Sequence, residues 1–452
     1  MSKKLVIVGG GPVGLAFALA ASRLADVDVT VVERNETPTS APAAAFDHRV
    51  YALSPASLAF LAEIGVSLDA ARGSKVRAMQ IWGDDGKSHL DLTKGPPLAT
   101  IVEHSALMFA LEQAVSRVER IDMLRGAIPK AMHAVGNQRE LEMADGNTIR
   151  ADLLIGADGS RSQIRDMAGI TAVIKDYESD GIVANFYCEF AHGDVARQWF
   201  TTDAVLAYLP LPQKLISIVW SVTKAKSDKL NALADDEFCR AVEAAGCNAL
   251  GKLTLASPIA RFPLARVIAS VWCAPGLALM GDAAHAVHPL AGQGVNLGFA
   301  DARTLYAVLS ERSSFSAIGD LLVLRKYARA RRESTFALSE VTDKLRALYM
   351  SESKAATWLR SRVTGTLQSD SRKLAPGDGF IAWPGAANDA RAHVQNALSR
   401  GASACLVERL GVESYQFADE KIAAYRNLKV ESGAVAAAYF DHPSRQLAVL
   451  AV

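Results

Sequence analysis

The chain has few cysteines and no excess of either charge, and both absences narrow its class. Its five cysteines are odd in number, scattered and free of any CxxC pair: Cys188, Cys239, Cys247, Cys273 and Cys405. Neither a disulfide framework nor a zinc site is indicated, and this usage fits a reducing cytoplasm. The 49 Lys and Arg against 48 Asp and Glu leave a formal net charge of +1. Because no overall field would hold a polyanion, nucleic acid is not an expected partner.

Long apolar runs are missing as well. No stretch reaches the roughly 18–20 apolar residues that cross a bilayer, and the start passes directly into a strand pattern. We therefore expect a cytoplasmic protein, with peripheral contact at the inner membrane face left open. Half of the 452 residues are hydrophobic and 21% are charged, which excludes the disordered and fibrous classes. At about 100–200 residues per domain, this length predicts two to four domains.

The opening segment follows the order strand, glycine turn, helix and strand, which is typical of a βαβ unit. It comprises Leu5–Val8, the GxGxxG glycines Gly9, Gly11 and Gly14, helical spacing from Val13 to Leu24, and Asp28–Val32. Such glycines allow a tight turn, close approach of backbone to a pyrophosphate, and close packing of helix on strand. Glu33 ends the second strand, where a carboxylate can accept hydrogen bonds from a ribose. A purely structural turn is the alternative, but this context favours binding of a dinucleotide with an unphosphorylated ribose.

Two later motifs place a carboxylate after an apolar strand. Asp158 and Gly159 follow the strand Asp152–Ile155, and alone they would indicate an ordinary β-turn. In Leu277–Gly298 a strand ends at Gly281 and Asp282, and a polar, glycine-rich loop then opens a helix near Asn296. Its backbone N–H groups could meet a polar ring or a pyrophosphate, and Asp282 a sugar-like hydroxyl. His285 and His288 lack a third ligand nearby, so no metal site is expected.

The rest of the chain shows a strand-rich middle and a helical segment. Strand patterns cover 181–190, 205–211 and 215–222, and helical spacing runs from Asp301 to about Met350. In that helical segment Leu321, Leu324 and Ala328 share one face, and Arg325, Arg329 and Arg332 another. The basic run over 325–332 fits either a solvated face or contact with anionic lipid. After about Trp358 a turn-rich segment begins, which we interpret as a domain boundary.

In this order the motifs resemble the group A flavoprotein aromatic hydroxylases, which have the para-hydroxybenzoate hydroxylase fold. His48–Ser57, Leu61–Gly65 and His288–Gly298 are further similar to the ubiquinone-biosynthesis hydroxylases. The resemblance covers about residues 3–350 and implies an α/β fold, in which a Rossmann-type FAD-binding domain is interleaved with a mixed β-sheet substrate domain. The predicted boundaries are 1–75, 97–178 and 265–350 for the FAD-binding domain, 76–96 and 179–264 for the substrate domain, and 358–452 for a small C-terminal α/β domain.

The resemblance also implies which residues hold FAD. Glycines and a carboxylate would hold its ADP half, and later residues its pyrophosphate and flavin. The implied cofactor-binding residues are Gly9, Gly11, Gly14, Glu33, Arg34, Arg49, His104, Asp158, Gly281, Asp282, Gly294, Val295 and Asn296. The loop with His288, Pro289, Gly292, Gln293 and Gly294 would flank the isoalloxazine, and Asp158 belongs to a motif that serves both FAD and NAD(P)H. A solvated surface histidine is the alternative for His104.

The implied function is FAD-dependent hydroxylation of a polyprenylated phenol in ubiquinone biosynthesis, through a C4a-hydroperoxyflavin formed with O2. The 2-polyprenyl-6-methoxyphenol stage is one candidate, and the electron donor is either NAD(P)H or a separate reductase. The protein has to orient the ring and exclude water, and the sequence identifies no catalytic acid or base. Aromatic residues of the middle could wall an apolar site or simply fill the core: Phe200, Tyr208, Trp220 and Phe262. Alternatives are another aromatic substrate, or a fusion protein that binds ligands without reacting.

The last 95 residues or so resemble a different family, the N-terminal domain of MurE-type Mur ligases. The resemblance rests on Ser369–Arg372, Pro376–Asp378, Phe380–Gly385 and Tyr439–Arg445, and it covers about residues 358–452. In that family Ser371 and Arg372 would lie in a motif near the UDP end of the substrate. The chain ends before a glycine-lysine phosphate loop, so no ligase activity is expected. Whether the junction is natural, and whether the tail binds a UDP-sugar, stay open.

Overall fold

A computed structural model describes most of the chain. The described residues are 2–83, 89–92, 95–201, 203–287, 294–333, 335, 367–385, 389–417, 419–425 and 428–429. They divide into two compact units, Met1–Met79 with Leu92–Arg197 and Val205–Ser339, and Gln80–Asp91 with Gln198–Ala204 and Glu340–Val452. Within the described residues, no helix has both the length and the apolarity needed to cross a membrane.

A six-stranded sheet in the order β19-β20-β12-β1-β2-β8 carries the glycine turn. All its neighbours pair in parallel except β19 and β20. Its strands are β1 (Lys3–Val8), β2 (Val27–Glu33), β8 (Ile121–Arg125), β12 (Leu153–Gly156), β19 (Cys273–Ala274) and β20 (Leu277–Leu279). With α1 (Pro12–Ala21) between β1 and β2, the predicted βαβ unit is confirmed.

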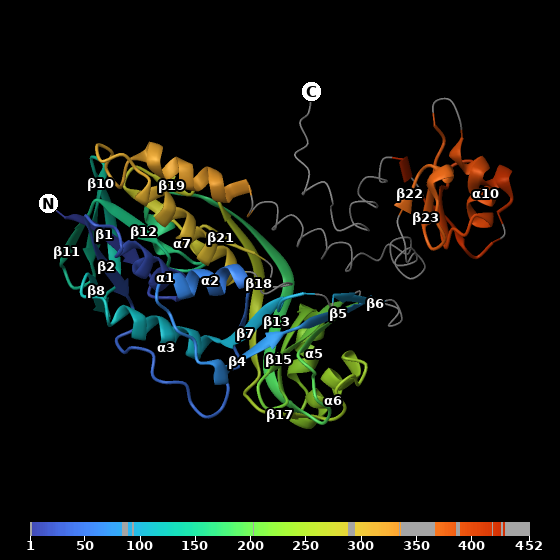
Figure 1. Ribbon diagram of the computed structural model, residues 1–452, viewed down its shortest axis with the longest axis horizontal. Helices are drawn as coiled ribbons and strands as arrows, with labels where there is room; N and C mark the ends of the chain where they lie inside the picture. Colours follow the sequence, from blue (N-terminus) through green and yellow to red (C-terminus); the bar gives the residue numbers. More distant parts are fainter. Residues whose placement is uncertain are drawn as a thin grey trace. The chain divides into compact units, whose positions relative to one another are not determined.

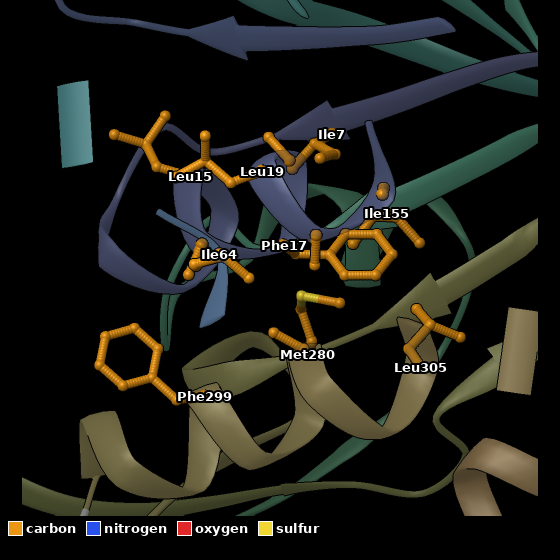
Figure 2. Close-up of a cluster of buried hydrophobic side chains, with 14 of the residues drawn as sticks. Ile7, Leu15, Phe17, Leu19, Ile64, Ile155, Met280, Phe299 and Leu305 are labelled. Carbon is orange, nitrogen blue, oxygen red and sulfur yellow. The ribbon is translucent and has the colours of Figure 1, made fainter. Parts of the chain in front are cut away.

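Both faces of this sheet are covered, which is why β1 is apolar without a break from Leu5 to Val8. Alternate residues of β1 point to opposite sides, so Leu5 and Ile7 join one core cluster and Val6 and Val8 another. In the first cluster Phe17 of α1 packs with Ile155 of β12, and with Met280 and Leu305 (Figure 2). The helices around it are α1, α2 (Pro55–Glu63), α3 (His104–Val115) and α7 (Gly294–Ser310).

Smaller elements complete this part of the fold. The sheet β11-β10-β9 comprises β9 (Pro129–Val135), β10 (Gln138–Met143) and β11 (Thr148–Ala151). The sheet β3-β7-β4 comprises β3 (Val50–Leu53), β4 (Gly73–Val76) and β7 (Ala99–Glu103). Short helical turns are η1 (Ala70–Arg72), α4 (Gln163–Met167) and η2 (Gly281–Ala283). The helical prediction for 301–350 holds in two parts, α7 and residues 321–333, with a turn between them; residues beyond 335 in that range lie outside the described part.

A nine-stranded sheet in the order β21-β18-β13-β16-β15-β14-β5-β6, with β17 beside β13, contains the three predicted middle strands. Figure 1 shows β18 running alongside β13, which begins earlier than predicted, at Ala172. Its strands are β5 (Ala78–Trp82), β6 (His89–Leu92), β13 (Ala172–Cys188), β14 (Val195–Thr201), β15 (Ala204–Leu211), β16 (Leu215–Thr223), β17 (Leu253–Leu255), β18 (Ala260–Ala269) and β21 (His285–Ala286). Helices α5 (Lys224–Asn231) and α6 (Asp235–Ala245) follow β16.

The pleat of this sheet separates the aromatic residues that the sequence grouped together. Trp220 lies 6.2 Å from Phe238 of α6, between ring centroids, and the Tyr208 hydroxyl donates to the Val242 carbonyl of the same helix. These two rings therefore belong to the core under α6. Phe262 instead lies across Gly181, where an added Cβ would stand 2.7 Å from its ring, and it is 39% exposed.

The described C-terminal residues form a small α/β fold of their own. A parallel sheet runs in the order β22-β23-β24-β25. Its elements are β22 (Leu367–Gln368), η4 (Ser371–Lys373), β23 (Gly379–Ala382), η5 (Ala390–His393), α10 (Val394–Ser399), β24 (Ala404–Glu408), η6 (Val412–Tyr415) and β25 (Ile422–Tyr425). Phe380, Val394 and Cys405 lie in its buried core. The predicted α/β class is thus confirmed throughout the described residues.

Candidate functional site

The GxGxxG turn has the close contacts that its glycines predict. Gly9 has a φ of +111°, and an added Cβ would stand 2.3 Å from the Ala157 carbonyl oxygen. A Cβ on Gly14 would stand 2.0 Å from the Gly9 oxygen, so this glycine lets α1 pack against the end of β1. A Cβ on Gly11 would meet no described atom within 4 Å. The turn is therefore closely packed against the protein at Gly9 and Gly14, and it is open at Gly11.

Glu33 faces this turn from the end of β2. Its Oε2 accepts a hydrogen bond from the Gly10 N–H at 2.7 Å, and its Oε1 accepts one from Asn35 N–H at 2.9 Å. The neighbouring Arg34 is exposed. The carboxylate thus lies at the carboxyl edge of the parallel sheet, beside the first turn of α1, where nucleotides bind in folds of this kind.

The Asp158 motif packs directly against the glycine turn. The Asp158 nitrogen lies 2.9 Å from the position that a Cβ on Gly9 would take. Asp158 Oδ2 accepts a hydrogen bond from Ile164 N–H at 3.1 Å. Its Oδ1 is buried and has no hydrogen-bond partner among the described residues. A buried carboxylate oxygen in that state favours a ligand donor.

Arg165 connects two motifs, and sequence reasoning gave it no role. It is 4% exposed, and its Nη1 donates to the Ser160 carbonyl at 3.1 Å and to the Ala283 carbonyl at 3.3 Å. The first carbonyl belongs to the loop after Asp158 and the second to η2, which carries Asp282. The only signal in the sequence was its place at the end of the Asp158 motif.

Gly281 and Asp282 form the start of η2. Gly281 has a φ of +57°, and its N–H donates to Asp301 Oδ2 at 2.9 Å. The Asp282 carboxylate reaches solvent but is surrounded by protein. Burial raises the pKa of Asp282, while His285 and Arg49 act in the opposite direction. A Cβ on Gly294 would stand 4.0 Å from Asp282 Oδ1, so this carboxylate faces the start of α7.

Arg49, Tyr51 and His104 form a polar cluster near Asp282. The Arg49 guanidinium carbon lies 5.4 Å from the Tyr51 ring centroid, and the Tyr51 hydroxyl is hydrogen-bonded to His104 Nδ1 at 3.0 Å. Burial raises the pKa of Tyr51 to about 12. Burial, helped by Arg49, lowers the pKa of His104 to about 4, so its imidazole is neutral near pH 7. His104 is half-buried here, not a solvated surface residue. Tyr51 was not among the predicted site residues, although it stands in the His48–Ser57 signature.

The segment before Arg49 is held by buried polar side chains. Glu103 is fully buried, accepts a hydrogen bond from Asp47 N–H at 2.7 Å, and pairs with Arg72. From the large sheet, Asn185 Nδ2 donates to the Phe46 carbonyl at 3.1 Å and to the Asp47 carbonyl at 2.9 Å. These contacts fix the backbone from which the Arg49 side chain extends.

At the start of α7 the predicted residues are Gly294, Val295 and Asn296. The Asn296 side chain donates to the Ala52 carbonyl at 2.8 Å and accepts from Ser57 Oγ at 2.7 Å, so it fastens α7 to β3 and α2. What this turn offers a ligand is its backbone, because the first N–H groups of a helix lack partners within it. His288, Pro289, Gly292 and Gln293 lie outside the described residues. The described part of the chain holds no group of three metal-ligating side chains close enough for a metal ion.

These features fit an FAD molecule. The glycine turn is open at Gly11, the Glu33 carboxylate lies beside this turn, and Asp158 Oδ1 is buried without a hydrogen-bond partner among the described residues. The starts of α1 and α7 present N–H groups to anionic and carbonyl oxygens. The motifs come from separate parts of the sequence, and in the fold the glycine turn lies against Asp158 and α1 against Gly281, while Asp282 faces the start of α7.

Comparison with known proteins identifies the family. Residues 3–340 match the family model described as FAD binding domain. The chain is 35% identical over 349 residues to 3-demethoxyubiquinol 3-hydroxylase of Escherichia coli (strain K12), covering 75% of this chain and 88% of the relative. It is 32% identical over 357 residues to ubiquinone hydroxylase UbiL of Rhodospirillum rubrum, covering 77% and 82%. Over 99 residues it is 61% identical to a UDP-N-acetylmuramoyl-L-alanyl-D-glutamate--2,6-diaminopimelate ligase of Acidovorax sp. (strain JS42), covering 22% of this chain and 20% of the ligase.

Solved structures show the same fold at low identity. PqsL from Pseudomonas aeruginosa, a probable FAD-dependent monooxygenase, superimposes with a TM-score of 0.64 at 20% identity, covering 78% of this chain and 97% of that chain. A 2-methyl-3-hydroxypyridine-5-carboxylic acid oxygenase superimposes with a TM-score of 0.62 at 21% identity, covering 80% and 96%. The chain belongs to the FAD binding domain family and, within it, to the FAD-dependent ubiquinone-biosynthesis hydroxylases, and it is an FAD-dependent monooxygenase.

Proposed function

We propose that this enzyme hydroxylates a polyprenylated phenol in ubiquinone biosynthesis, with the 2-polyprenyl-6-methoxyphenol stage as the first candidate. The observation that carries the proposal is the convergence of Arg49, His104 and Asp282, together with relatives named for ubiquinol and ubiquinone hydroxylation. FAD is the cofactor and O2 the co-substrate, with NAD(P)H or a separate reductase as the donor.

The chain's own residues would divide the work of holding FAD. Gly9, Gly11 and Gly14 would receive the pyrophosphate, and Glu33 the adenosine ribose, beside the exposed Arg34. Farther along, Arg49 would lie along the flavin and pyrophosphate, Asp282 would bind ribityl or pyrophosphate-side groups, and His104 would contact the flavin. Asp158 would serve both FAD and NAD(P)H. Gly281, Gly294, Val295 and Asn296 would shape the flavin end through their backbone. Bound FAD supplies the redox chemistry and the activation of O2.

The protein's further tasks are to orient the ring and to keep water out. Phe262 and Gly181 lie on the face of the large sheet opposite the α6 core, and Asn185 on that face holds the segment before Arg49. We assign this face to the phenol ring. The domain boundaries proposed are 1–75, 97–178 and 265–350 for FAD, 76–96 and 179–264 for the substrate, and 358–452 for the Mur-like tail.

The test is purification followed by reconstitution and product analysis. The protein should carry, or take up, FAD with an oxidised-flavin spectrum. A polyprenylated phenol should stimulate O2 uptake and gain one oxygen atom by mass spectrometry. Protein that cannot be loaded with FAD would overturn the proposal. Oxygen insertion into a different phenol would support another aromatic substrate, and FAD binding without oxygen insertion into any phenol would indicate a binding-only fusion.

A peripheral membrane contact is a second proposal, and one observation favours it. On the helix 321–333, Leu322, Arg325, Lys326 and Arg329 are exposed at helical spacing, and Leu322 is 69% exposed. We name these four residues, with the exposed Arg332, the basic face. Arg331 does not belong to it: the sequence placed it in the basic run, but it is buried and bound to Asp301. A basic helix face with an apolar side chain suits anionic lipid, in which a polyprenyl substrate dissolves.

A further inference from the structure

Asp301 is a buried carboxylate in the middle of α7 and is not itself among the predicted cofactor contacts. Its exposed fraction is 0%, and both of its oxygens are engaged. Oδ2 is hydrogen-bonded to His285 Nε2 at 2.6 Å and accepts the Gly281 N–H at 2.9 Å. Oδ1 accepts a hydrogen bond from Arg331 Nε at 2.7 Å. One side chain thus joins η2, β21, α7 and the helix 321–333.

The charges around Asp301 favour its ionised form. Burial alone would raise the pKa of this carboxyl, but His285 and Arg331 outweigh burial and lower it. Arg331 is itself 8% exposed and also donates to the Leu297 carbonyl of α7 at 3.4 Å. A buried charge with this many partners is costly to build, because each partner must be desolvated as well. Such a group specifies one arrangement of the elements that it joins.

Two of the elements joined by Asp301, η2 and α7, flank the proposed flavin site. Before residues 288–293 lie Gly281, Asp282 and His285, and after them α7 begins at Gly294. Asp301 binds the first side through Gly281 and His285, and it belongs to the second side. Asp282 lies next to the bonded Gly281 and faces Gly294. On its other side η2 is held through the Ala283 carbonyl by Arg165.

We propose that Asp301 is a positioning residue, which fixes the Asp282 carboxylate against the first turn of α7 so that both meet the polar groups of the flavin together. His285 and Arg331 hold Asp301 in place. This inference rests on the proposed role of Asp282 in binding FAD. It adds a residue that touches neither cofactor nor substrate and acts on the site through Gly281.

A double-mutant cycle on FAD affinity tests this coupling. Asp282→Asn and Asp301→Asn should each raise the FAD dissociation constant of the full-length protein about tenfold, which is the size of one lost charge-assisted hydrogen bond. If Asp301 acts through Asp282, the double variant should also lose about tenfold, since the second change removes nothing more. Independent effects would multiply to about a hundredfold. The constant is measured by flavin fluorescence on folded protein, well below the unfolding temperature.

Matched variants separate positioning from stability. Phe238→Leu removes core volume in the large sheet and should lower the unfolding temperature while leaving the FAD dissociation constant unchanged. Asp301→Asn removes a buried negative charge that is hydrogen-bonded to the buried Arg331, so it is also expected to destabilise the fold. If Asp301→Asn fails to fold, His285→Ala takes its place in the cycle. His285→Gln keeps an N–H toward Asp301 and should restore the FAD affinity that His285→Ala loses.

The outcomes distinguish the two proposals. Wild-type protein that binds no FAD would overturn the proposed function. The positioning role alone would be overturned if the wild type binds FAD and one of two results follows. Either Asp301→Asn lowers the unfolding temperature and leaves the FAD dissociation constant unchanged, or its effect on that constant multiplies with the effect of Asp282→Asn. A double variant that binds FAD as tightly as each single variant supports the positioning role.

Discussion

The Tyr51 hydroxyl lies 3.0 Å from Nδ1 of His104, and this hydrogen bond joins the middle of β3 to the first residue of α3. The pair lies beside Arg49, whose positive charge disfavours a second one on the imidazole. His104 is therefore a neutral hydrogen-bonding group near pH 7. Such a group can donate or accept toward a cofactor without adding charge.

The neutral state of His104 predicts a pH dependence of stability. Its pKa is about 4 in the folded protein and near 6.5 when unfolded, so between these values the unfolded chain binds more protons. Stability from this group is present above about pH 6.5 and is lost as the pH falls toward 4; at pH 5 the loss amounts to about 2 kcal/mol. Urea unfolding of His104→Gln at pH 5 and 7.5 should lack this loss.

The matched control for that measurement is His133→Gln, because His133 lies exposed on β9. It should keep the full pH dependence of the wild type. If His104→Gln and wild type lost the same free energy between pH 7.5 and 5, His104 would not be held neutral by the fold.

Alanine substitutions at Gly11 and Gly14 should have different effects, because Gly11 faces the proposed cofactor and Gly14 packs against the protein. Gly14→Ala brings a methyl group to 2.0 Å from the Gly9 oxygen, so it should cost about 3 kcal/mol or more of folding free energy. Gly11→Ala meets no described atom within 4 Å, so the fold should persist while the FAD dissociation constant rises at least about tenfold. Thermal unfolding of apoprotein and flavin titration measure the two effects.

Gly83→Ala is the control, since a Cβ there also meets no atom of the described residues within 4 Å and the residue lies outside the glycine turn. It should change neither quantity. Unchanged FAD affinity in Gly11→Ala would mean that the open side of the turn does not receive the cofactor.

The sequence predicts helices and strands well where the hydrophobic periodicity and the turn-forming glycines indicate the same element. The βαβ unit follows from a continuous apolar strand, three glycines and Glu33, and all of these act within about thirty residues. Tyr51 and Arg165 were missed because their roles come from partners far away in the chain: His104 for one and Ala283 for the other.

Burial of charge was the hardest feature to predict. Arg331 stands in a run of basic residues, and composition alone places such a run in solvent. One signal was present: Asp301 falls between Leu297 and Leu305 on the apolar stripe of α7, where an acid requires a buried partner. Nothing in either local pattern identifies Arg331 as that partner, because the pairing depends on how two helices pack.

The basic face can be tested without disturbing Arg331. Changing Arg325, Lys326, Arg329 and Arg332 to Gln should weaken flotation with phosphatidylglycerol-containing vesicles at least about tenfold, since each basic residue near an anionic surface contributes about 1 kcal/mol. A control variant with four exposed lysines changed to Gln, at 175, 214, 229 and 252, has the same net charge and should float like the wild type. Equal flotation of both variants and wild type would remove the membrane role of this face.

The tail allows a test of its own stability, because it has a separate buried core. Arg391 is 6% exposed, pairs with Asp389 at 2.7 Å, and donates to the Leu410 carbonyl at 2.6 Å. Arg391→Ala leaves this acid and carbonyl without their partner and should cost the tail about 2–3 kcal/mol. Calorimetry of the full-length protein should show one transition shifted down, while the release of FAD, followed by its fluorescence, keeps its temperature. If the temperature of FAD release also falls in Arg391→Ala, the tail contributes to the stability of the cofactor-binding fold. The tail would then be a structural part of the hydroxylase.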